Sequence, residues 1–155
     1  MENQEIIDEG KQYIVVKLGC EQYGIDIQYV DNIVRMQRIT RVPKAQNYFK
    51  GVINLRGEII PVMSIRLKFN LEDDEITKKS RIIIIKTEQQ ALIGVMVDEV
   101  KEVVTLTEDQ VEKVAYEHDK DDLNSYLVGV GKCNHELISL LNINGVISEK
   151  EKGEN

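Results

Sequence analysis

Few residues of this chain are of the types that carry out covalent or metal chemistry, and they do not converge on a site. Cys133 and His135 lie two positions apart, which would place both side chains on one side of a strand. That pair is half of a zinc site, and the sequence holds no second pair to complete it. His118 lies in the acidic stretch EHDKDD, which lacks the regular Asp and Asn spacing and the closing Glu of a calcium loop. We therefore predict no metal and no cofactor, and expect both histidines to be solvated.

Motifs for phosphate binding and nucleophilic catalysis are also missing. None of the ten glycines belongs to a GxxxxGK(S/T), GxGxxG or GxSxG pattern. The carboxylates of Asp26, Asp31, Asp98 and Glu99 are explained as polar faces of half-buried strands. The sequence therefore predicts no catalytic residues and a protein that is not an enzyme.

The charge balance disfavours nucleic acid and anionic membranes as partners. The 155 residues include 20 Lys and Arg against 27 Asp and Glu, a formal net charge of −7. Binding to a phosphate backbone or an anionic membrane surface needs concentrated Lys and Arg. No stretch reaches the roughly 18 apolar residues of a membrane-spanning helix, and the acidic start MENQEIIDEGK does not resemble an export signal. We expect a cytoplasmic protein with Cys20 and Cys133 as reduced thiols.

The apolar pattern predicts an all-β fold. Ile14–Val16 and Ile82–Ile85 are short β-branched runs, and Tyr23–Ile27 alternates apolar and polar residues. The remaining predicted strands are Ile33–Met36, Gly51–Leu55, Ile59–Met63, Ala91–Val97, Glu102–Leu106, Tyr126–Lys132 and Leu137–Leu140. Short helices are predicted at Ser64–Phe69, Thr107–Val114 and Asn142–Val146. Residues 1–11 and 148–155 are polar and charged, and we expect them to be flexible tails.

The chain also repeats itself. Tyr48–Ile65 aligns without gaps on Tyr126–Ile143 at an offset of 78 residues, and Tyr23–Val34 aligns on Ile93–Val104 at an offset of 70. The offset grows because the second half carries an extra acidic loop, Tyr116–Asn124. We interpret this as two copies of a unit of about 60 residues, too small to be stable alone. Two generic β-meanders of similar composition are the alternative.

This repeat predicts a single domain over residues 12–147. One subdomain of five strands is expected at about residues 12–79 and a second at about residues 80–147. The two are expected to form small barrels packed on each other along a hydrophobic seam. A groove between such lobes is a natural docking place for a helix.

One segment is specific enough to suggest a family. In Gly51–Phe69, GVINLRGEIIPVMSIRLKF, a strand, a tight turn, a second strand and a short helix follow one another. Gly57 can take the positive φ that such a turn needs, so we assign it a structural role. With the preceding YGIDIQYVDNIV and the later IGVMVDEV, this order of motifs resembles the CheW family of chemotaxis coupling proteins. The chain departs from the family pattern at Asn32, where an acidic residue is common, and at Ser64, where Asp is usual but Ser can still cap the helix.

The resemblance runs through essentially the whole chain and implies both a fold and a role. The fold would be two five-stranded SH3-like barrels packed side by side, with a few short helices. The role would be a scaffold in two-component signal transduction that couples the cytoplasmic tips of chemoreceptors, the methyl-accepting chemotaxis proteins, to the histidine kinase CheA. Such an adaptor would reach the membrane only through receptor arrays. A CheW-like adaptor of a different chemosensory pathway is the main alternative, and a small-barrel nucleic-acid-binding protein is a remote one.

The resemblance also assigns candidate residues. The receptor tip is a helical hairpin, so its site should be an apolar groove with a polar rim. Its expected residues are Val30, Ile33, Lys50, Arg56, Gly94, Val100 and Val103. Val30 and Val100 are equivalent in the repeat, as are Ile33 and Val103, and packing between the lobes is the alternative role for these four.

Arg56 and the kinase surface complete the assignment. An Arg at the tip of a tight turn has no structural need to be there, so we predict that Arg56 binds carboxylates or carbonyls. The regulatory domain of CheA is expected to bind Ile39, Val42, Pro43 and Ala45, which could equally form a lid.

Overall fold

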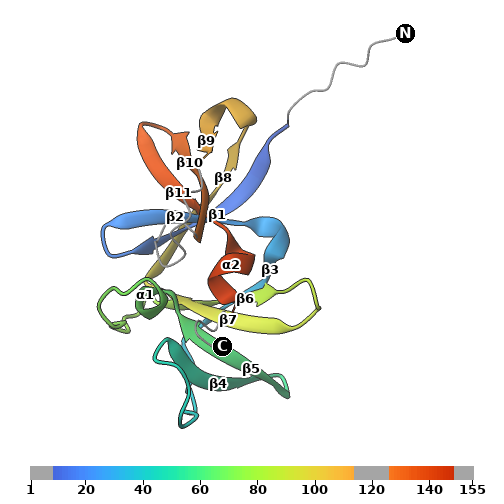
Figure 1. Cartoon of the computed structure of the whole chain (residues 1–155), viewed down its shortest axis with the longest axis vertical. Coiled ribbons are helices and arrows are strands. Elements are labelled where there is room, and N and C mark those ends of the chain that lie inside the picture. Colours follow the sequence, from blue (N-terminus) through green and yellow to red (C-terminus); the bar gives the residue numbers. More distant parts are fainter. Residues whose placement is uncertain (1–8, 114–125, 149–155) are drawn as a thin grey trace, which may run out of the picture.

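The computed structural model describes residues 9–113 and 126–148, and most of them lie in strands (Figure 1). The prediction of an all-β fold with a few short helices is confirmed. The strands are β1 (Lys11–Leu18), β2 (Glu21–Asp26), β3 (Val30–Arg35), β4 (Phe49–Leu55), β5 (Glu58–Ser64), β6 (Arg81–Lys86), β7 (Leu92–Val97), β8 (Glu99–Leu106), β9 (Val111–Lys113), β10 (Leu127–Cys133) and β11 (Glu136–Leu141). The helices are α1 (Ile65–Lys68) and α2 (Ile143–Ile147), with 3-10 turns η1 (Ile27–Tyr29) and η2 (Glu108–Gln110).

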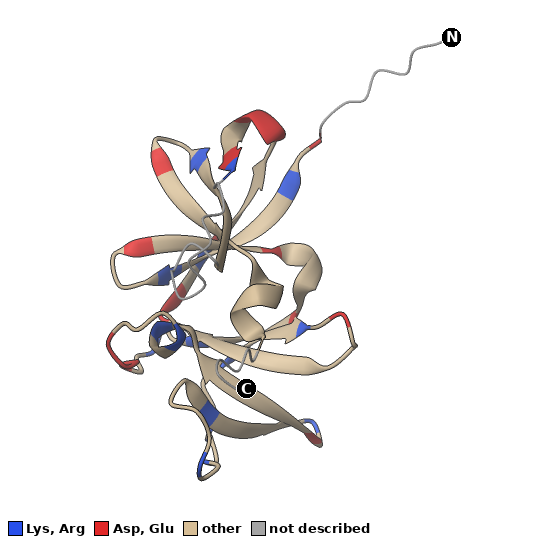
Figure 2. Cartoon of the chain, viewed as in Figure 1, with Lys and Arg blue, Asp and Glu red and all other residues tan. Residues whose placement is uncertain are grey.

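The expected tails and the acidic loop Tyr116–Asn124 lie largely or wholly outside the described residues. No helix in the described ranges is long and apolar enough to cross a membrane. Basic and acidic residues both occur along most of the described ribbon (Figure 2).

The strands form two sheets, and neither sheet follows the halves of the chain. Sheet A has the order β8-β1-β2-β11-β10-β9, and sheet B has the order β3-β6-β7-β5-β4. The hairpin of β1 and β2 therefore lies among strands of the second half, and β6 and β7 lie among strands of the first. The expected boundary near residues 79–80 is thus wrong as a division between the sheets. An alignment of the two halves cannot reveal this exchange. It shows which strands are equivalent, but it does not show whether a strand pairs with strands of its own half or of the other half.

The exchange nevertheless obeys the internal repeat. Replacing each strand by its repeat equivalent converts the order β8-β1-β2-β11-β10 into β3-β6-β7-β5-β4. The registers agree as well, because the parallel pair β2–β11 places Gly24 opposite Leu140 and the parallel pair β7–β5 places Gly94 opposite Val62. These two residue pairs are related by the offsets of 70 and 78. The shared order and register support a duplicated unit over a chance likeness between meanders.

The helix expected at Thr107–Val114 is a single 3-10 turn followed by a strand. Thr107 and Gln110 form a capping box at this turn, in which the Thr107 N–H donates to the Gln110 Oε1 atom at 2.9 Å. The chain then extends as β9 and pairs with β10, with Val111 packed against the core of sheet A. Strand pairing at the sheet edge thus overrides a short helical pattern, and sheet A has six strands instead of five.

In the described part of the chain, three clusters of buried side chains stabilise the two sheets, and the largest contains residues of both. Along β6, Ile83 and Ile85 belong to this central cluster, whereas Ile82 and Ile84 belong to a cluster inside sheet B. The strand β1 alternates in the same way between the central cluster and a cluster inside sheet A. A strand that is buried on both faces needs apolar residues at every position, which explains the unbroken run Ile82–Ile85. Burying one such side chain contributes about 1.5–3 kcal/mol, so these central strands stabilise the fold strongly.

Candidate interaction surfaces

Four apolar residues of the predicted receptor site lie on the outermost strands β3 and β8. Val30 and Val100 are half-buried and pack against the central cluster. Ile33 and Val103 are 37% and 50% exposed, respectively. Their cross-strand partners belong to the central cluster, so both side chains project toward the side of the sheet that faces it. We call these four residues the edge-strand surface.

Matching β-bulges give the two strands this arrangement. In β3, Asp31 is an extra residue opposite β6, and in β8, Lys101 is an extra residue opposite β1. A bulge allows residues three positions apart to face the same side of a sheet. Each strand can therefore present both of its apolar residues together. Because Asp31 and Lys101 are equivalent in the repeat, the edge-strand surface draws matching residues from each half.

Gly94 does not belong to this surface, contrary to expectation. It is buried in the middle of β7, and its neighbour Val95 is the residue that faces the central cluster. A Cβ atom on Gly94 would lie 2.7 Å from Ile82 Cγ2 and 3.4 Å from Val62 Cγ2. Gly94 therefore allows close packing inside sheet B. Position within a motif could not show this, because the sequence does not say which face of β7 meets a partner.

Arg56 lies at the tip of the β4–β5 hairpin. Arg56 and Gly57 have φ angles of 54° and 86°, and the Gly57 N–H donates to Asn54 Oδ1 at 3.0 Å. The positive φ predicted for Gly57 is confirmed, whereas that of Arg56 was not foreseen. A non-glycine residue in this region costs about 1 kcal/mol. Within the described residues the Arg56 guanidinium makes no hydrogen bond or ion pair. Arg56 therefore combines a strained backbone with a charged side chain that is available to a partner.

Lys50 is placed apart from the edge-strand surface, on β4 at the other edge of sheet B. Its Nζ lies 2.9 Å from Asp73 Oδ1, and this hydrogen bond lowers the pKa of Asp73. Burial raises the pKa of the neighbouring Asp74, whose carboxylate accepts a hydrogen bond from Ser64 Oγ. Ser64 Oγ also accepts the Leu67 N–H, so the expected Ser cap of α1 is confirmed.

The four residues expected to bind the kinase are divided between the core and an exposed loop. Ile39 packs against the cluster inside sheet B. Val42, Pro43 and Ala45 are exposed and line a hollow of about 330 Å³. The three loop residues can therefore contact a partner, whereas Ile39 supports the loop from beneath.

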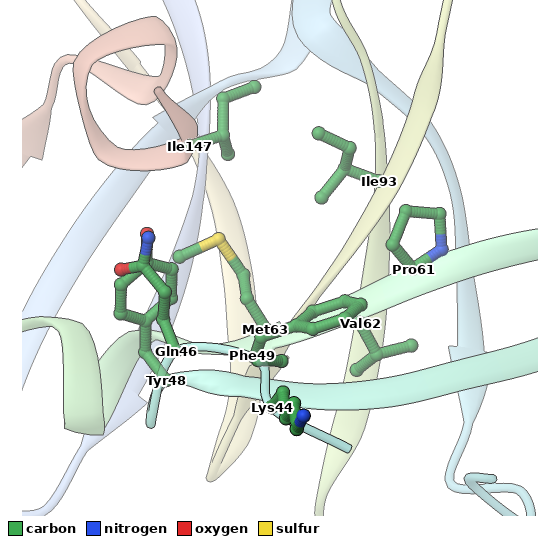
Figure 3. A pocket seen from close by; sticks show the side chains of 10 residues that line it. Lys44, Gln46, Tyr48, Phe49, Pro61, Val62, Met63, Ile93 and Ile147 are labelled. Atoms are coloured by element: carbon green, nitrogen blue, oxygen red, sulfur yellow. The ribbon is translucent and has the colours of Figure 1, made fainter. Parts of the chain in front are cut away.

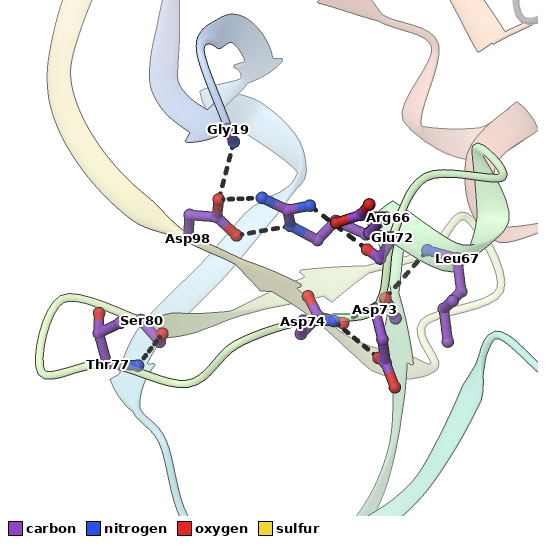
Figure 4. Close-up of polar contacts among 10 residues, drawn as sticks. Gly19, Arg66, Leu67, Glu72, Asp73, Asp74, Thr77, Ser80 and Asp98 are labelled. Carbon is purple, nitrogen blue, oxygen red and sulfur yellow. Dashed lines mark hydrogen bonds and ion pairs between the residues drawn. The ribbon is translucent and has the colours of Figure 1, made fainter.

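An ion pair that the sequence did not reveal joins the two sheets. Arg66 of α1 donates from Nε and Nη2 to the Asp98 carboxylate, at 3.0 and 2.6 Å (Figure 4). The Gly19 N–H, in the turn between β1 and β2, donates to the same carboxylate at 2.7 Å. The hydrogen bonds from Arg66 hold the pKa of Asp98 below its ordinary value, against the effect of burial. We call this contact the Arg66–Asp98 clamp; it connects α1 and the end of β7 in sheet B to sheet A.

The residues with potential for metal or thiol chemistry remain apart. Cys20 and Cys133 are both free cysteines. His135 is exposed at the tip of the β10–β11 hairpin, at the position equivalent to Gly57, with a φ of 70°. Within residues 9–113 and 126–148, no group of three or more His, Cys, Asp and Glu side chains could bind a metal ion. His118 lies outside these ranges.

Two packed sheets with exposed apolar edges, and a strained arginine without a partner in the described part, are typical of a protein-binding module. The chain belongs to the CheW family, because residues 12–151 match the family's CheW-like domain. The expected family and the all-β fold class are thereby confirmed.

Individual relatives align with nearly the full length of this chain. The chemotaxis protein CheW of Bacillus subtilis is 34% identical, with 93% of this chain and 91% of the relative aligned. The corresponding protein of Klebsiella aerogenes is 32% identical, covering 92% and 84%. The crystal structure of the scaffolding protein TtCheW from Thermoanaerobacter tengcongensis matches with a TM-score of 0.82 at 28% identity, covering 98% and 97%.

Proposed function

We propose that this chain is a non-enzymatic adaptor that couples the cytoplasmic tips of chemoreceptors to the histidine kinase CheA. Membership of the CheW-like family over residues 12–151 supports this role. So do the relatives named chemotaxis protein CheW and the solved relative described as a scaffolding protein. The observation that carries the proposal is Arg56, a strained and exposed cation that the described fold does not use.

The edge-strand surface is the proposed contact for the apolar face of a receptor helix. Its four aliphatic residues come from two strands, and the two on the outside, Ile33 and Val103, are accessible without unfolding. A helix can lay an apolar face on such a surface, while the planar fork of Arg56 binds carboxylates or carbonyls of the partner. Lys50 contributes less, because Asp73 already neutralises it.

The exposed loop residues Val42, Pro43 and Ala45 are the proposed contact for the CheA regulatory domain. They lie on the loop between β3 and β4, and Lys50 of the predicted receptor site lines the same hollow. In this proposal the kinase uses the loop while the receptor uses the edge-strand surface and Arg56, so that the adaptor can bind both at once.

The test is a pair of binding assays with a receptor cytoplasmic fragment and the CheA regulatory domain. Arg56→Glu should weaken receptor binding at least about tenfold and leave kinase binding unchanged. Val42→Asp should do the reverse. Asn134→Glu is the matched control, since Asn134 occupies the equivalent turn position with a φ of 53°, and it should bind both partners normally.

Two results would contradict the proposal. Failure of the folded wild-type protein to bind either partner would reopen the alternative of another chemosensory pathway. Equal loss of receptor binding in Arg56→Glu and Asn134→Glu would show that turn distortion, rather than the arginine, is responsible.

A further inference from the structure

Beside α1, three aromatic rings fill a site at the border of the central cluster. Phe69, directly after α1, stacks on Tyr126 with ring centroids 5.2 Å apart. Tyr23 of β2 packs against Phe69 at 5.8 Å. Tyr23 and Phe69 are only 4% and 8% exposed, and Tyr126 is half-buried. The chain therefore closes this site with its own aromatic side chains.

The equivalent site beside α2 is open. The repeat equivalents of the three aromatic residues, at offsets of 70 and 78, are Ile93, Ile147 and Tyr48. These residues line a cavity of about 540 Å³, together with Met63 and Pro61 (Figure 3). Two of the three rings are replaced by isoleucines, which are shorter and leave space where the rings would lie. Of the three equivalents only Tyr48, the counterpart of the ring on which Phe69 stacks, is aromatic, and the neighbouring Phe49 adds a second ring to the lining.

The open site keeps the features that bind a ring. Tyr48 can stack with an incoming aromatic group as Tyr126 stacks with Phe69, and Met63 offers a thioether that packs well against ring edges. An apolar cavity of about 150 Å³ already accommodates benzene in another protein, so this one has ample room. Lys68 Nζ lies 4.1 Å from the centroid of the Tyr48 ring on one side and donates to the Ser148 carbonyl at 3.0 Å. These contacts hold the Tyr48 ring in place.

The mouth of the cavity is basic. Lys44, Ala45 and Gln46, which are exposed, form part of its wall. A second hollow shares these three residues and adds Arg41 and Lys50. The loop of residues 36–48 contains Arg38, Arg41 and Lys44 but no Asp or Glu. Lys50 is paired with Asp73, whereas Arg41 and Lys44 form no ion pair within the described residues.

We propose that the cavity beside α2 binds an aromatic side chain presented by an acidic segment of a partner protein. The ring would occupy the place that Phe69 occupies in the filled site, and flanking carboxylates would meet Arg41 and Lys44. An apolar anchor surrounded by complementary charge is the usual construction of a binding hot spot. This inference goes beyond the proposed adaptor function, because it concerns the interior of a cavity that neither the edge-strand surface nor Arg56 includes and that shares only Ala45 with the proposed kinase contact.

The experiment titrates the ¹⁵N-labelled full chain with two synthetic peptides and follows amide shifts by NMR. The probe is the acetylated pentapeptide Glu-Asp-Phe-Asp-Glu, and the matched peptide carries Ala in place of Phe. We expect saturable shifts centred on Lys44, Tyr48 and Ile147, with the Ala peptide at least about tenfold weaker. A neutral Gln-Asn-Phe-Asn-Gln peptide should bind about threefold or more weakly than the probe.

Two variants separate occupancy of the cavity from general effects on the fold. Ile147→Phe places a ring where Phe69 lies in the filled site, so it should abolish peptide binding without lowering the melting temperature. If that variant does not fold, Lys44→Glu provides the test, because its exposed side chain can change without disturbing the core. It should weaken binding about threefold or more, whereas the control Lys132→Glu, on the exposed face of β10, should not.

Several outcomes would overturn the inference. They are the absence of binding by the Phe peptide, shifts centred outside the cavity, equal binding of the Ala or neutral peptide, and unchanged binding by a folded Ile147→Phe protein. Because no receptor or kinase is present in the assay, these outcomes are independent of the tests of the adaptor function.

Discussion

The ends of α1 and α2 are equivalent in the repeat, yet they are fixed in different ways. At α1, Arg66 donates hydrogen bonds to the Asp98 carboxylate, which also accepts the N–H of Gly19 from the other sheet. The residue of α2 equivalent to Arg66 is Asn144, whose amide donates to Glu88 Oε2 at 3.5 Å, the outer limit of a hydrogen bond. The α1 end also has the aromatic trio, and the α2 end has the cavity. One copy of the unit thus ties the sheets together, while the other leaves surface available to partners.

Removing the Arg66–Asp98 clamp should produce the largest difference in stability between the α1 and α2 ends. Arg66→Ala leaves the partly buried Asp98 carboxylate without its main partner, so the free energy of unfolding should fall by about 2 kcal/mol. Asn144→Ala, the equivalent change, should alter it by less than about 0.5 kcal/mol. Urea denaturation followed by circular dichroism measures both values. Equal losses would mean that α1 and α2 are fixed to the same extent.

Acidification should weaken the same end of the molecule by a smaller amount. Arg66 lowers the pKa of Asp98 in the folded state, so Asp98 stabilises the fold above its unfolded-state pKa of about 4. That contribution is lost as the pH falls through the lower, folded-state pKa. Between about pH 5 and pH 3, the free energy of unfolding should therefore decline less steeply for Asp98→Asn than for the wild-type chain.

Asp74 serves as a control, because its pKa is shifted in the opposite direction to that of Asp98. Burial raises its pKa, so the folded state takes up a proton more readily than the unfolded state and gains stability on acidification. Asp74→Asn removes that gain and should make the decline steeper. If both variants changed the slope in the same direction, Asp98 and Asp74 would not have the roles assigned to them.

The sequence predicted those parts of the fold that depend on local burial. The run Ile82–Ile85 identified a central strand, because side chains on both faces of β6 are buried. The alignment of Tyr48–Ile65 on Tyr126–Ile143 makes Arg56-Gly57 and Asn134-His135 equivalent, and all four residues have a positive φ angle at a hairpin turn. A turn can be recognised in this way because its conformation depends on neighbouring residues. The family resemblance selected Val30 and Val100, which the structure places at equivalent positions on β3 and β8; their role in receptor binding stays a prediction.

What the sequence could not predict depends on which segments lie opposite each other. Gly94 was assigned to a groove, but its Cβ position is blocked by Ile82 of the adjacent strand. Arg66 and Asp98 are 32 residues apart and meet only because α1 and the end of β7 converge. The exchange of strand pairs and the open cavity beside α2 arise in the same way, from contacts between segments that are distant in the chain.

The smallest expected effect concerns the two hairpin tips, and it distinguishes function from stability. Each turn needs two residues at positive φ, and each contains one that suits this conformation and one that does not. Asn134 tolerates positive φ better than Arg56, and Gly57 tolerates it better than His135. Exchanging residues between the halves should therefore stabilise both tips. Arg56→Asn and His135→Gly should each raise the free energy of unfolding by up to about 1 kcal/mol.

The two exchanges should differ in what they do to binding. Arg56→Asn removes the free guanidinium, so it should weaken receptor binding even though the protein becomes more stable. His135→Gly should leave receptor binding unchanged. Thermal melts and the receptor-binding assay on the same two preparations provide the measurement. An Arg56→Asn protein that is more stable and still binds the receptor normally would show that the strained arginine contributes to neither binding nor stability. If Arg56→Asn instead becomes more stable and binds the receptor more weakly, the β4–β5 turn is less stable than it could be because it presents a charged side chain to the receptor.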